Sequence, residues 1–186
     1  MAYSVELIVD ALQKLTSDFD YNNGKPNKNF QYKYFLTLLY FLNNSPKCEK
    51  GLSQAIQNGL KITTINPENG NTLLMDLASE KFAINPKIDT TPIIQALIQN
   101  GIEINKKNSM NNNTAIMLSV HNHEQLKCLV ANNANISIKN NDNKTAADIA
   151  FEKHWIFIKN MSKGSFVENE FFKNYCYLKH LEKRNN

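Results

Sequence analysis

The distribution of apolar and polar positions along the chain predicts short helices that are separated by polar loops. Apolar residues recur three or four positions apart, as in Leu126, Leu129 and Val130, which places them on one face of a helix. The most apolar run, residues 34–42, is far shorter than the about 20 residues that a membrane-spanning helix needs. We therefore expect a helical protein without a membrane span.

Two short phrases recur along the chain in the same order. The first places a threonine ahead of an apolar run, at Thr72, Thr114 and Thr145. The second phrase occurs at residues 57–62, 99–105 and 131–136. Thr114 and Thr145 are 31 residues apart, whereas Thr72 and Thr114 are 42 apart, so one unit carries an insertion. Two phrases that recur at near-constant spacing indicate a repeat protein.

These phrases resemble those of the ankyrin repeat. The family's opening, Gly-x-Thr-Pro-Leu-x-x-Ala, matches the first phrase, and its closing, Leu-Leu-x-x-Gly-Ala-x-Ile-Asn, matches the second, over about residues 30–161. The family's proline is replaced by Leu73, Ala115 and Ala146, so the repeats are degenerate. The resemblance implies an all-α solenoid of about four helix–turn–helix repeats, each joined to the next by an extended hairpin loop, with capping helices at both ends.

The resemblance divides the chain into three parts. Residues 1–29 are expected to form an N-terminal helix and a polar loop, and residues 162–186 a C-terminal capping helix. The repeats between them are assigned to 30–65, 66–107 with the insertion at 80–91, 108–138 and 139–161. No unit can bury its apolar face alone, so the units must stack on one another and the end helices must cover the outermost faces.

Residues at the predicted helix ends have specific expected roles. The hydroxyl of a threonine ahead of an apolar run can cap a helix, and Thr91-Pro92 is expected to start one as its N-cap and first position. The Asn-Gly pairs at 58–59 and 100–101, and also Asn133, suit the left-handed backbone that ends a helix. Asp148 stands where the family has a histidine, and the resemblance implies that it bonds to a neighbouring loop.

The charge of the chain is small and lies toward its end. The net charge is +4; residues 1–100 sum to zero, whereas residues 153–186 hold seven Lys or Arg against three Glu. Residues 166–184 mix aromatic and basic side chains, a combination that can bind single-stranded nucleic acid. The charges lie off the apolar stripe of this segment, so we prefer a capping helix with a solvated basic face and expect no nucleic acid partner. The stripe consists of Val167, Phe171, Tyr175, Leu178 and Leu181.

Candidate chemistry is sparse in this sequence. Three distant cysteines indicate reduced thiols in a cytosolic setting, and Cys128 lies among apolar residues like a packed core cysteine. The segment 121–124, His-Asn-His-Glu, contains metal-ligand residue types, but their spacing does not fit one helical face. Neither a Ser-His-Asp set nor a glycine-rich phosphate loop is present in the sequence. We therefore expect no enzyme activity, no metal and no cofactor.

A concave, protein-binding face is the functional site that the resemblance implies. In ankyrin-like proteins the hairpin loops and the first helices line this face. The residues that match exposed loop positions are Asn66, Asn69, Asn71, Asn108, Asn111, Asn113, Lys139, Asp142 and Lys144. The residues that match first-helix positions are Ser79, Glu80, His121, Asn122, Glu152 and Lys153. Each of these residues is also interpretable as a good turn former without a partner.

The amino-acid composition gives information about the organism that the protein comes from rather than about its chemical activity. Asparagine makes up 29 of the 186 residues and lysine 20 of the 21 basic ones, a bias typical of an AT-rich genome. With few, degenerate repeats, the chain resembles ankyrin proteins of intracellular bacteria. That resemblance implies a monomeric, non-catalytic effector that binds a eukaryotic host protein and acts in a cytoplasm, after secretion without a classical signal peptide.

Three other functions stay open at this stage. One is a bacterial housekeeping or immunity-type binding protein, and a second is an adaptor from a eukaryote or a large virus. The third is a small enzyme or nucleic-acid binder that uses the basic, aromatic C-terminal segment.

Overall fold

The computed structural model describes residues 48–57, 61–80, 89–160 and 169–185. The expected N-terminal helix and loop at 1–29, the apolar run at 34–42, the Asn-Gly pair at 58–59 and most of the insertion at 80–91 lie outside the described residues. The helices are α3 (Cys48–Gln57), α4 (Leu73–Leu77), α5 (Thr91–Gln99), α6 (Ala115–Leu118), α7 (His123–Ala131), α8 (Ala146–Asn160) and α9 (Glu170–Asn185).

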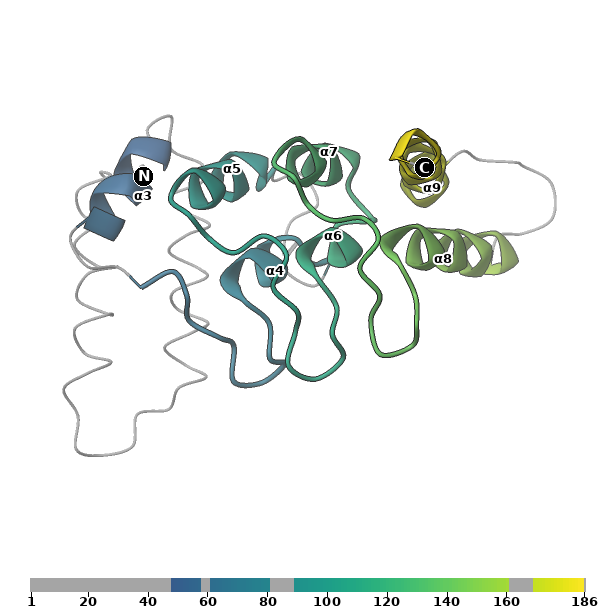
Figure 1. The fold of residues 1–186 in the computed structure, drawn as a ribbon, viewed down its shortest axis with the longest axis horizontal. Coiled ribbons are helices and arrows are strands. Elements are labelled where there is room, and N and C mark those ends of the chain that lie inside the picture. The colour runs from purple at the N-terminus through teal and green to yellow at the C-terminus, as the bar shows by residue number, and fades with distance from the viewer. Residues whose placement is uncertain (1–47, 58–60, 81–88, 161–168, 186) are drawn as a thin grey trace.

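The described helices form two stacked rows (Figure 1). Helices α3, α5, α7 and α9 lie side by side in one row, and the first helices α4, α6 and α8 lie in the other. Helix α4 contacts α5, α6 contacts α7, and α8 contacts α9, so each pair is one repeat unit. Hairpin loops extend from the row of first helices. In the part of the chain described, the sole β-bridge joins Ile65 and Thr72. The all-α, ankyrin-like solenoid predicted from the sequence is therefore confirmed.

The hydrophobic core lies between the two rows. Leu126 and Leu129 are fully buried there, as their helical spacing predicts. Cys128 is half-buried against this core, and its thiol donates a hydrogen bond to Gln95 Oε1 at 3.2 Å. Burial raises the pKa of the Cys128 thiol, with a smaller contribution from the charge of Asp89. The thiol is therefore protonated at neutral pH and is not a nucleophile.

Threonine caps two of the three helices that follow the recurring phrase. Thr72 Oγ1 accepts a hydrogen bond from Met75 N at 3.2 Å, and Thr145 Oγ1 accepts one from Asp148 N at 3.3 Å. Thr114 Oγ1 is buried, yet it has no hydrogen-bond partner among the described residues. The predicted threonine cap is thus confirmed at α4 and α8 and is wrong at α6.

Asp148 binds the start of its own helix, which corrects the expectation that it reaches a neighbouring loop. Its Oδ2 accepts hydrogen bonds from Thr145 N at 2.9 Å and from Thr145 Oγ1 at 2.8 Å. Burial alone would raise the pKa of Asp148, but these bonds and the charges of Lys179 and Lys139 hold it below its ordinary value of 3.8. A carboxylate at the third position of a helix lies close to the N-cap residue, so its bond to Thr145 is the local capping arrangement.

Replacing threonine by valine distinguishes a threonine whose hydroxyl caps its helix from the one whose hydroxyl does not. We expect Thr145→Val to lower the free energy of unfolding by about 1 kcal/mol, because the cap of α8 is lost. Thr114→Val should change it by less than about 0.5 kcal/mol, since its hydroxyl has no bond to lose. Asp148 has a depressed folded pKa, so the part of the Thr145→Val cost that comes from the hydroxyl's bond to this carboxylate is fully present above its ordinary pKa and is lost as pH falls through the folded value. Urea unfolding of both variants at two pH values measures these effects. Equal costs for Thr145→Val and Thr114→Val would contradict the assignment of a cap at Thr145 and none at Thr114.

The turns after the second helices follow the sequence prediction. Gly101 has a φ of 83° and Asn133 a φ of 66°, so both adopt the left-handed backbone expected of them.

The start of α5 differs by one position from the prediction. Thr91 is its first residue, and its N–H donates to Asp89 Oδ1 at 2.9 Å. Thr90, the residue at the N-cap, instead donates its hydroxyl to Leu77 O at 3.3 Å.

Helix α9 occupies the place of a second helix in the last unit. Asn174 Nδ2 donates to Val120 O at 2.9 Å, which ties α9 to the turn between α6 and α7. Leu178 is fully buried, and Phe171, Tyr175 and Leu181 pack against the core, whereas Val167 lies outside the described residues. The apolar stripe of this helix is therefore used mainly for packing, as the sequence indicates. Of the described helices, none is long and apolar enough to cross a bilayer.

Candidate functional site

Among the described residues, three hairpin loops lie on the side of the first helices that faces away from the second helices. The loops are residues 66–72, 108–114 and 140–145. Each begins with an asparagine whose side-chain oxygen accepts a hydrogen bond from the backbone N–H two residues later. The distances are 2.9 Å at Asn66, 2.7 Å at Asn108 and 3.0 Å at Asn140. This side-chain turn is one that asparagine forms readily, so one geometry recurs in all three loops.

The loops are joined to one another by side-chain amides. Asn108 Nδ2 donates to Asn69 O at 2.7 Å and to Asn71 Oδ1 at 2.5 Å. In the next pair of loops, Asn140 Nδ2 donates to Asn113 Oδ1 at 2.8 Å. We call the set Asn71, Asn108, Asn113 and Asn140 the amide ladder. Because each rung bonds one loop to the next, the three loops hold a fixed spacing.

Asp76 of α4 anchors the first loop. Its side chain is only 4% exposed and accepts hydrogen bonds from three amide groups. The donors are Nδ2 of Asn66 at 2.7 Å, Asn69 at 3.0 Å and Asn71 at 2.6 Å. A buried carboxylate is stable only when its oxygens are hydrogen-bonded in this manner. The ladder is therefore connected to the row of first helices.

The loop asparagines correct two expectations from the sequence. Asn66 and Asn108 were expected at exposed positions, but they are 8% and 1% exposed. Asn69, Asn71 and Asn113 are half-buried and hydrogen-bonded. These amides turn inward because each can donate and accept a hydrogen bond at once. Asparagine at these positions thus has a structural role, which the compositional interpretation missed.

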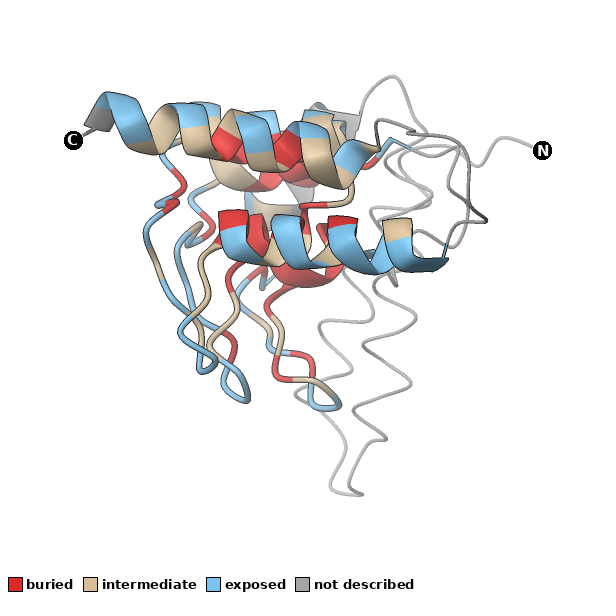
Figure 2. Ribbon diagram, turned by 90° about the vertical axis from the view of Figure 1, so that its right-hand side faces the viewer, coloured by how far each residue is buried: buried red, intermediate tan, exposed pale blue. Residues whose placement is uncertain are grey.

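Other members of the predicted site stay exposed at the loop tips. Asn111 and Asp142 are exposed within their loops, Lys139 is exposed directly before the third loop, and Met110 is 59% exposed. Figure 2 shows exposed residues gathered at these tips, with buried positions nearer the helices. Sequence reasoning did not single out Met110. The signal that could have identified Met110 is its position in the second loop, next to the predicted site residue Asn111.

Three predicted residues from successive repeat units meet beyond the loops. Lys153 Nζ of α8 lies 2.8 Å from Glu80 Oε2 after α4, and the charge of Glu80 acts on His121, which lies after α6. The hydrogen bond from Lys153 lowers the pKa of Glu80. Burial lowers the pKa of His121, so its ring is mainly neutral at pH 7. We call Glu80, His121 and Lys153 the charged cluster.

A second ion pair joins the third hairpin loop to α8. Lys144 Nζ lies 2.9 and 2.7 Å from the two carboxylate oxygens of Glu152, and this bond raises the pKa of Lys144. Exposed pairs of this kind add little to stability, so their side chains can be redirected toward a partner.

Two other residues of the predicted site have structural roles instead. Ser79 Oγ donates to Asp76 O at 2.8 Å, and Asn122 Oδ1 accepts from two N–H groups at the start of α7.

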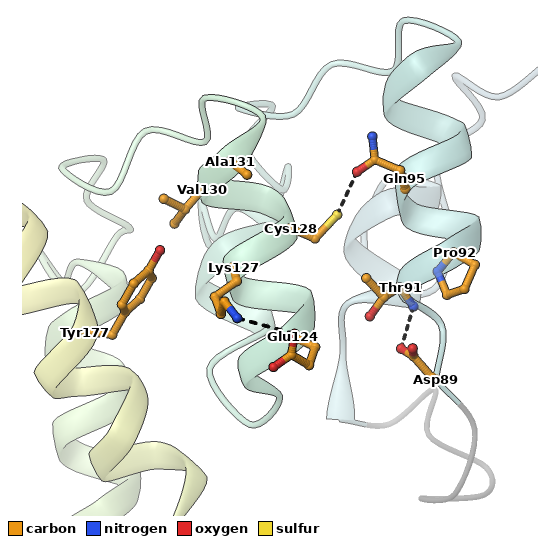
Figure 3. Close-up of a pocket in the computed structure, with 10 residues that line it drawn as sticks. All are labelled: Asp89, Thr91, Pro92, Gln95, Glu124, Lys127, Cys128, Val130, Ala131 and Tyr177. Carbon is orange, nitrogen blue, oxygen red and sulfur yellow. Dashed lines mark hydrogen bonds and ion pairs between the residues drawn. The ribbon is translucent and has the colours of Figure 1, made fainter.

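A shallow groove lies on the other side of the molecule, among α5, α7 and α9 (Figure 3). It encloses about 560 Å³. Gln95 and Cys128 face each other across it, and Glu124 and Lys127 form an ion pair at 3.6 Å. The thiol is protonated and these charges pair with each other, so the groove offers no activated nucleophile. Within the described residues, no group of three His, Cys, Asp or Glu side chains could hold a metal ion.

Glycine substitutions test how closely the loops approach one another. Gly70 and Gly101 have φ values of 70° and 83°, so alanine at either position costs about 1 kcal/mol of backbone strain. A methyl group at Gly70 would also collide with Ser109 Oγ of the next loop, whereas nothing lies within 4 Å at Gly101. We expect Gly70→Ala to cost about 2 kcal/mol in urea unfolding. In a Ser109→Gly background the difference between the two costs should shrink, although Met110 Cγ would still lie 3.3 Å from the added methyl group. An unchanged difference would contradict the contact with Ser109.

Helix pairs that stack in two rows, with hairpin loops on one side, define an ankyrin-like repeat solenoid. No protein-family model matches the sequence, and no curated protein matches it. Among solved structures, the chain is similar to the ankyrin repeat domain of Bcl-3, a member of the IκB protein family. The sequences are 19% identical over 60% of this chain and 46% of that chain, with a TM-score of 0.45. The similarity thus spans less than half the length of that chain.

Proposed function

We propose that this protein is a non-catalytic binding module that holds a partner protein against its hairpin loops and the adjoining ends of its first helices. The observation that carries the proposal is the amide ladder. It bonds each loop to the next and, through Asp76, to α4. Loops that are fixed before binding lose little conformational entropy when a partner arrives.

The chemistry of the exposed tips supports a protein partner. Met110 offers a flexible apolar side chain, while Lys139, Asn111 and Asp142 offer a cation, an amide and an anion. Methionine adapts to varied apolar partners, and isolated polar groups around it give orientation and specificity. The charged cluster extends the same face with groups of both signs. We infer a mixed polar interface rather than a strongly charged or wholly apolar one.

The wider role that we propose is that of a bacterial effector acting on a eukaryotic host protein. It rests on the Lys- and Asn-rich composition and on the few, degenerate repeats. Affinity capture with quantitative mass spectrometry, run on eukaryotic and bacterial lysates in parallel, tests this role. A eukaryotic partner is the expected result. A bacterial partner alone would overturn the effector role and favour a housekeeping or immunity protein.

A loop-tip variant tests the site itself. Met110→Ser, Lys139→Ala and Asp142→Ala remove exposed side chains, so the fold should be unaffected. The matched control carries Glu124→Ala and Lys127→Ala, which are exposed on α7 beside the groove of Figure 3. We expect the loop-tip variant to lose the captured partner at least tenfold and the control to retain it. Retention by the loop-tip variant, with unchanged thermal melting, would contradict the proposed face.

A further inference from the structure

The last described repeat unit, α8 and α9, presents an aromatic surface on its outward side. Figure 2 looks onto this end, with α8 and α9 in front. The buried residues Ala146 and Ala150 lie on the side of α8 that faces the rest of the stack. Helical periodicity puts Phe151 and Trp155 on another side, toward the end of the stack. We call the outward side of these two helices the end face; its members are Phe151, Trp155, Phe172, Tyr175 and Cys176.

The aromatic rings of the end face form one connected group. The centroids of Phe151 and Tyr175 lie 5.0 Å apart, and those of Phe151 and Trp155 lie 6.2 Å apart. Phe172 extends the group, with its centroid 6.4 Å from that of Tyr175. Phe151 is 41% exposed and Trp155 is 57% exposed. A continuous aromatic patch of this kind marks an interaction surface more than scattered apolar residues do.

An aromatic side on a helix pair is unusual when no other helix packs on it, because each unit of a solenoid stacks its apolar side on a neighbouring unit. Among the described helices, α6 contacts α8 and α7 contacts α9, and both lie on the side of the stack rather than on the outward side. The natural complement is therefore a second helix pair that presents the same kind of surface.

We propose that the end face binds the end face of a second copy of this chain, forming a two-fold symmetric dimer. Helices α8 and α9 run antiparallel: His154 contacts Phe172, Phe151 contacts Tyr175, and the opposite charges of Asp148 and Lys179 interact at the other end. A two-fold axis parallel to these helices lays each α8 on the α9 of the other copy. Rotation about this axis does not shift a residue along the helix direction, so residues that lie level with each other in one copy also lie level across the dimer.

Charge complementarity favours this arrangement over an unrelated partner. In the dimer Asp148 of one copy faces Lys179 of the other, and the reciprocal pair forms by symmetry. Phe151 and Trp155 face Phe172 and Tyr175 in the same way. One surface thus supplies both halves of a matched interface, as a contact between identical copies requires. This proposal differs from the monomer expected from the sequence.

The size of the end face predicts a weak dimer. The helices have 15 and 16 residues, so at about 1.5 Å per residue they are about 22 and 24 Å long. With each helix about 10 Å wide, they cover about 500 Å² on each copy, or about 1,000 Å² in a dimer. This area lies at the lower limit for a specific interface. We expect a dissociation constant in the micromolar range.

Sedimentation equilibrium of the full chain across micromolar concentrations tests the proposal. The wild-type chain should show a reversible monomer–dimer equilibrium, and Trp155→Ser should raise its dissociation constant at least tenfold. Ile156→Ser is the matched control, because Ile156 is 55% exposed on the same helix but points about 100° away. It should leave the dissociation constant within about twofold. A wild-type monomer at all concentrations, or equal effects of the two variants, would overturn the proposal.

Cross-linking through Cys176 gives a second readout that does not depend on the folding of the Trp155 variant. Cys176 is exposed on α9 within the end face. In a chain with Cys48→Ser and Cys128→Ser, a short bis-maleimide should join two copies through Cys176 at dimer-forming concentrations. Absence of this cross-link where sedimentation shows dimers would place the interface elsewhere. The loop-tip variant should dimerise normally, which separates this proposal from the proposed function.

Discussion

Replacing Asp76 by alanine will lower the free energy of unfolding by about 3 kcal/mol. The carboxylate is 4% exposed and accepts hydrogen bonds from the amides of Asn66, Asn69 and Asn71. Its removal leaves three N–H donor groups without their partner in a site with little access to water. Typical domains have a total stability of about 5–15 kcal/mol, so this loss is a large share of it.

Urea unfolding followed by far-ultraviolet circular dichroism measures the effect. Asp142→Ala is the matched control, because Asp142 is an exposed carboxylate in another loop. It should change the free energy of unfolding by less than about 0.5 kcal/mol. Asp76→Asn keeps the shape of the side chain and one acceptor oxygen, so about half of the loss should return. Equal losses for Asp76→Ala and Asp142→Ala would contradict an anchoring role.

Asn108→Ala will lower the free energy of unfolding by about 2–3 kcal/mol, the largest effect expected for any rung of the ladder. The side chain is 1% exposed, and it donates to Asn69 O and Asn71 Oδ1. Its oxygen accepts from Met110 N at 2.7 Å and from Asn111 N at 3.0 Å. One residue therefore shapes its own loop and holds the loop before it.

The last rung provides the comparison for Asn108. Asn140 makes the same kinds of bond but is half-buried, so Asn140→Ala should cost only about 1 kcal/mol. A double-mutant cycle between Asn71→Ala and Asn108→Ala should show a coupling of about 0.5–1 kcal/mol, since the two side chains bond directly. Additive costs would mean that the rung between these loops contributes nothing.

The repeat architecture was predictable because its signals are local. A threonine ahead of an apolar run, a left-handed residue after a helix and apolar residues at helical spacing each depend on neighbours along the chain. Gly101, Asn133 and Leu126 accordingly behave as the sequence predicts. The cap at Thr114 failed because the same pattern does not guarantee a bond.

The amide ladder was not predictable from composition or from turn propensity. Its bonds join residues such as Asn71 and Asn108, which are 37 positions apart. Asparagine suits an exposed turn as well as a buried rung, so the residue type alone does not distinguish them. The usable signal was positional: Asn66, Asn108 and Asn140 begin their loops at matching places in the repeat. Exposure of Asn66 and Asn108 was wrongly expected because each loop was considered by itself.

A ladder of amides also links the chemical ageing of the protein to its folding. Asparagine is a thermolabile residue, because its side chain can lose ammonia and become a carboxylate. In the ladder, Asn108 and Asn71 hold each other, so the reaction has to wait until the loops separate. A carboxylate formed at Asn108 would then face the carbonyl of Asn69 and repel it. Each opening of the loops thus exposes the protein to a change that makes the next opening easier.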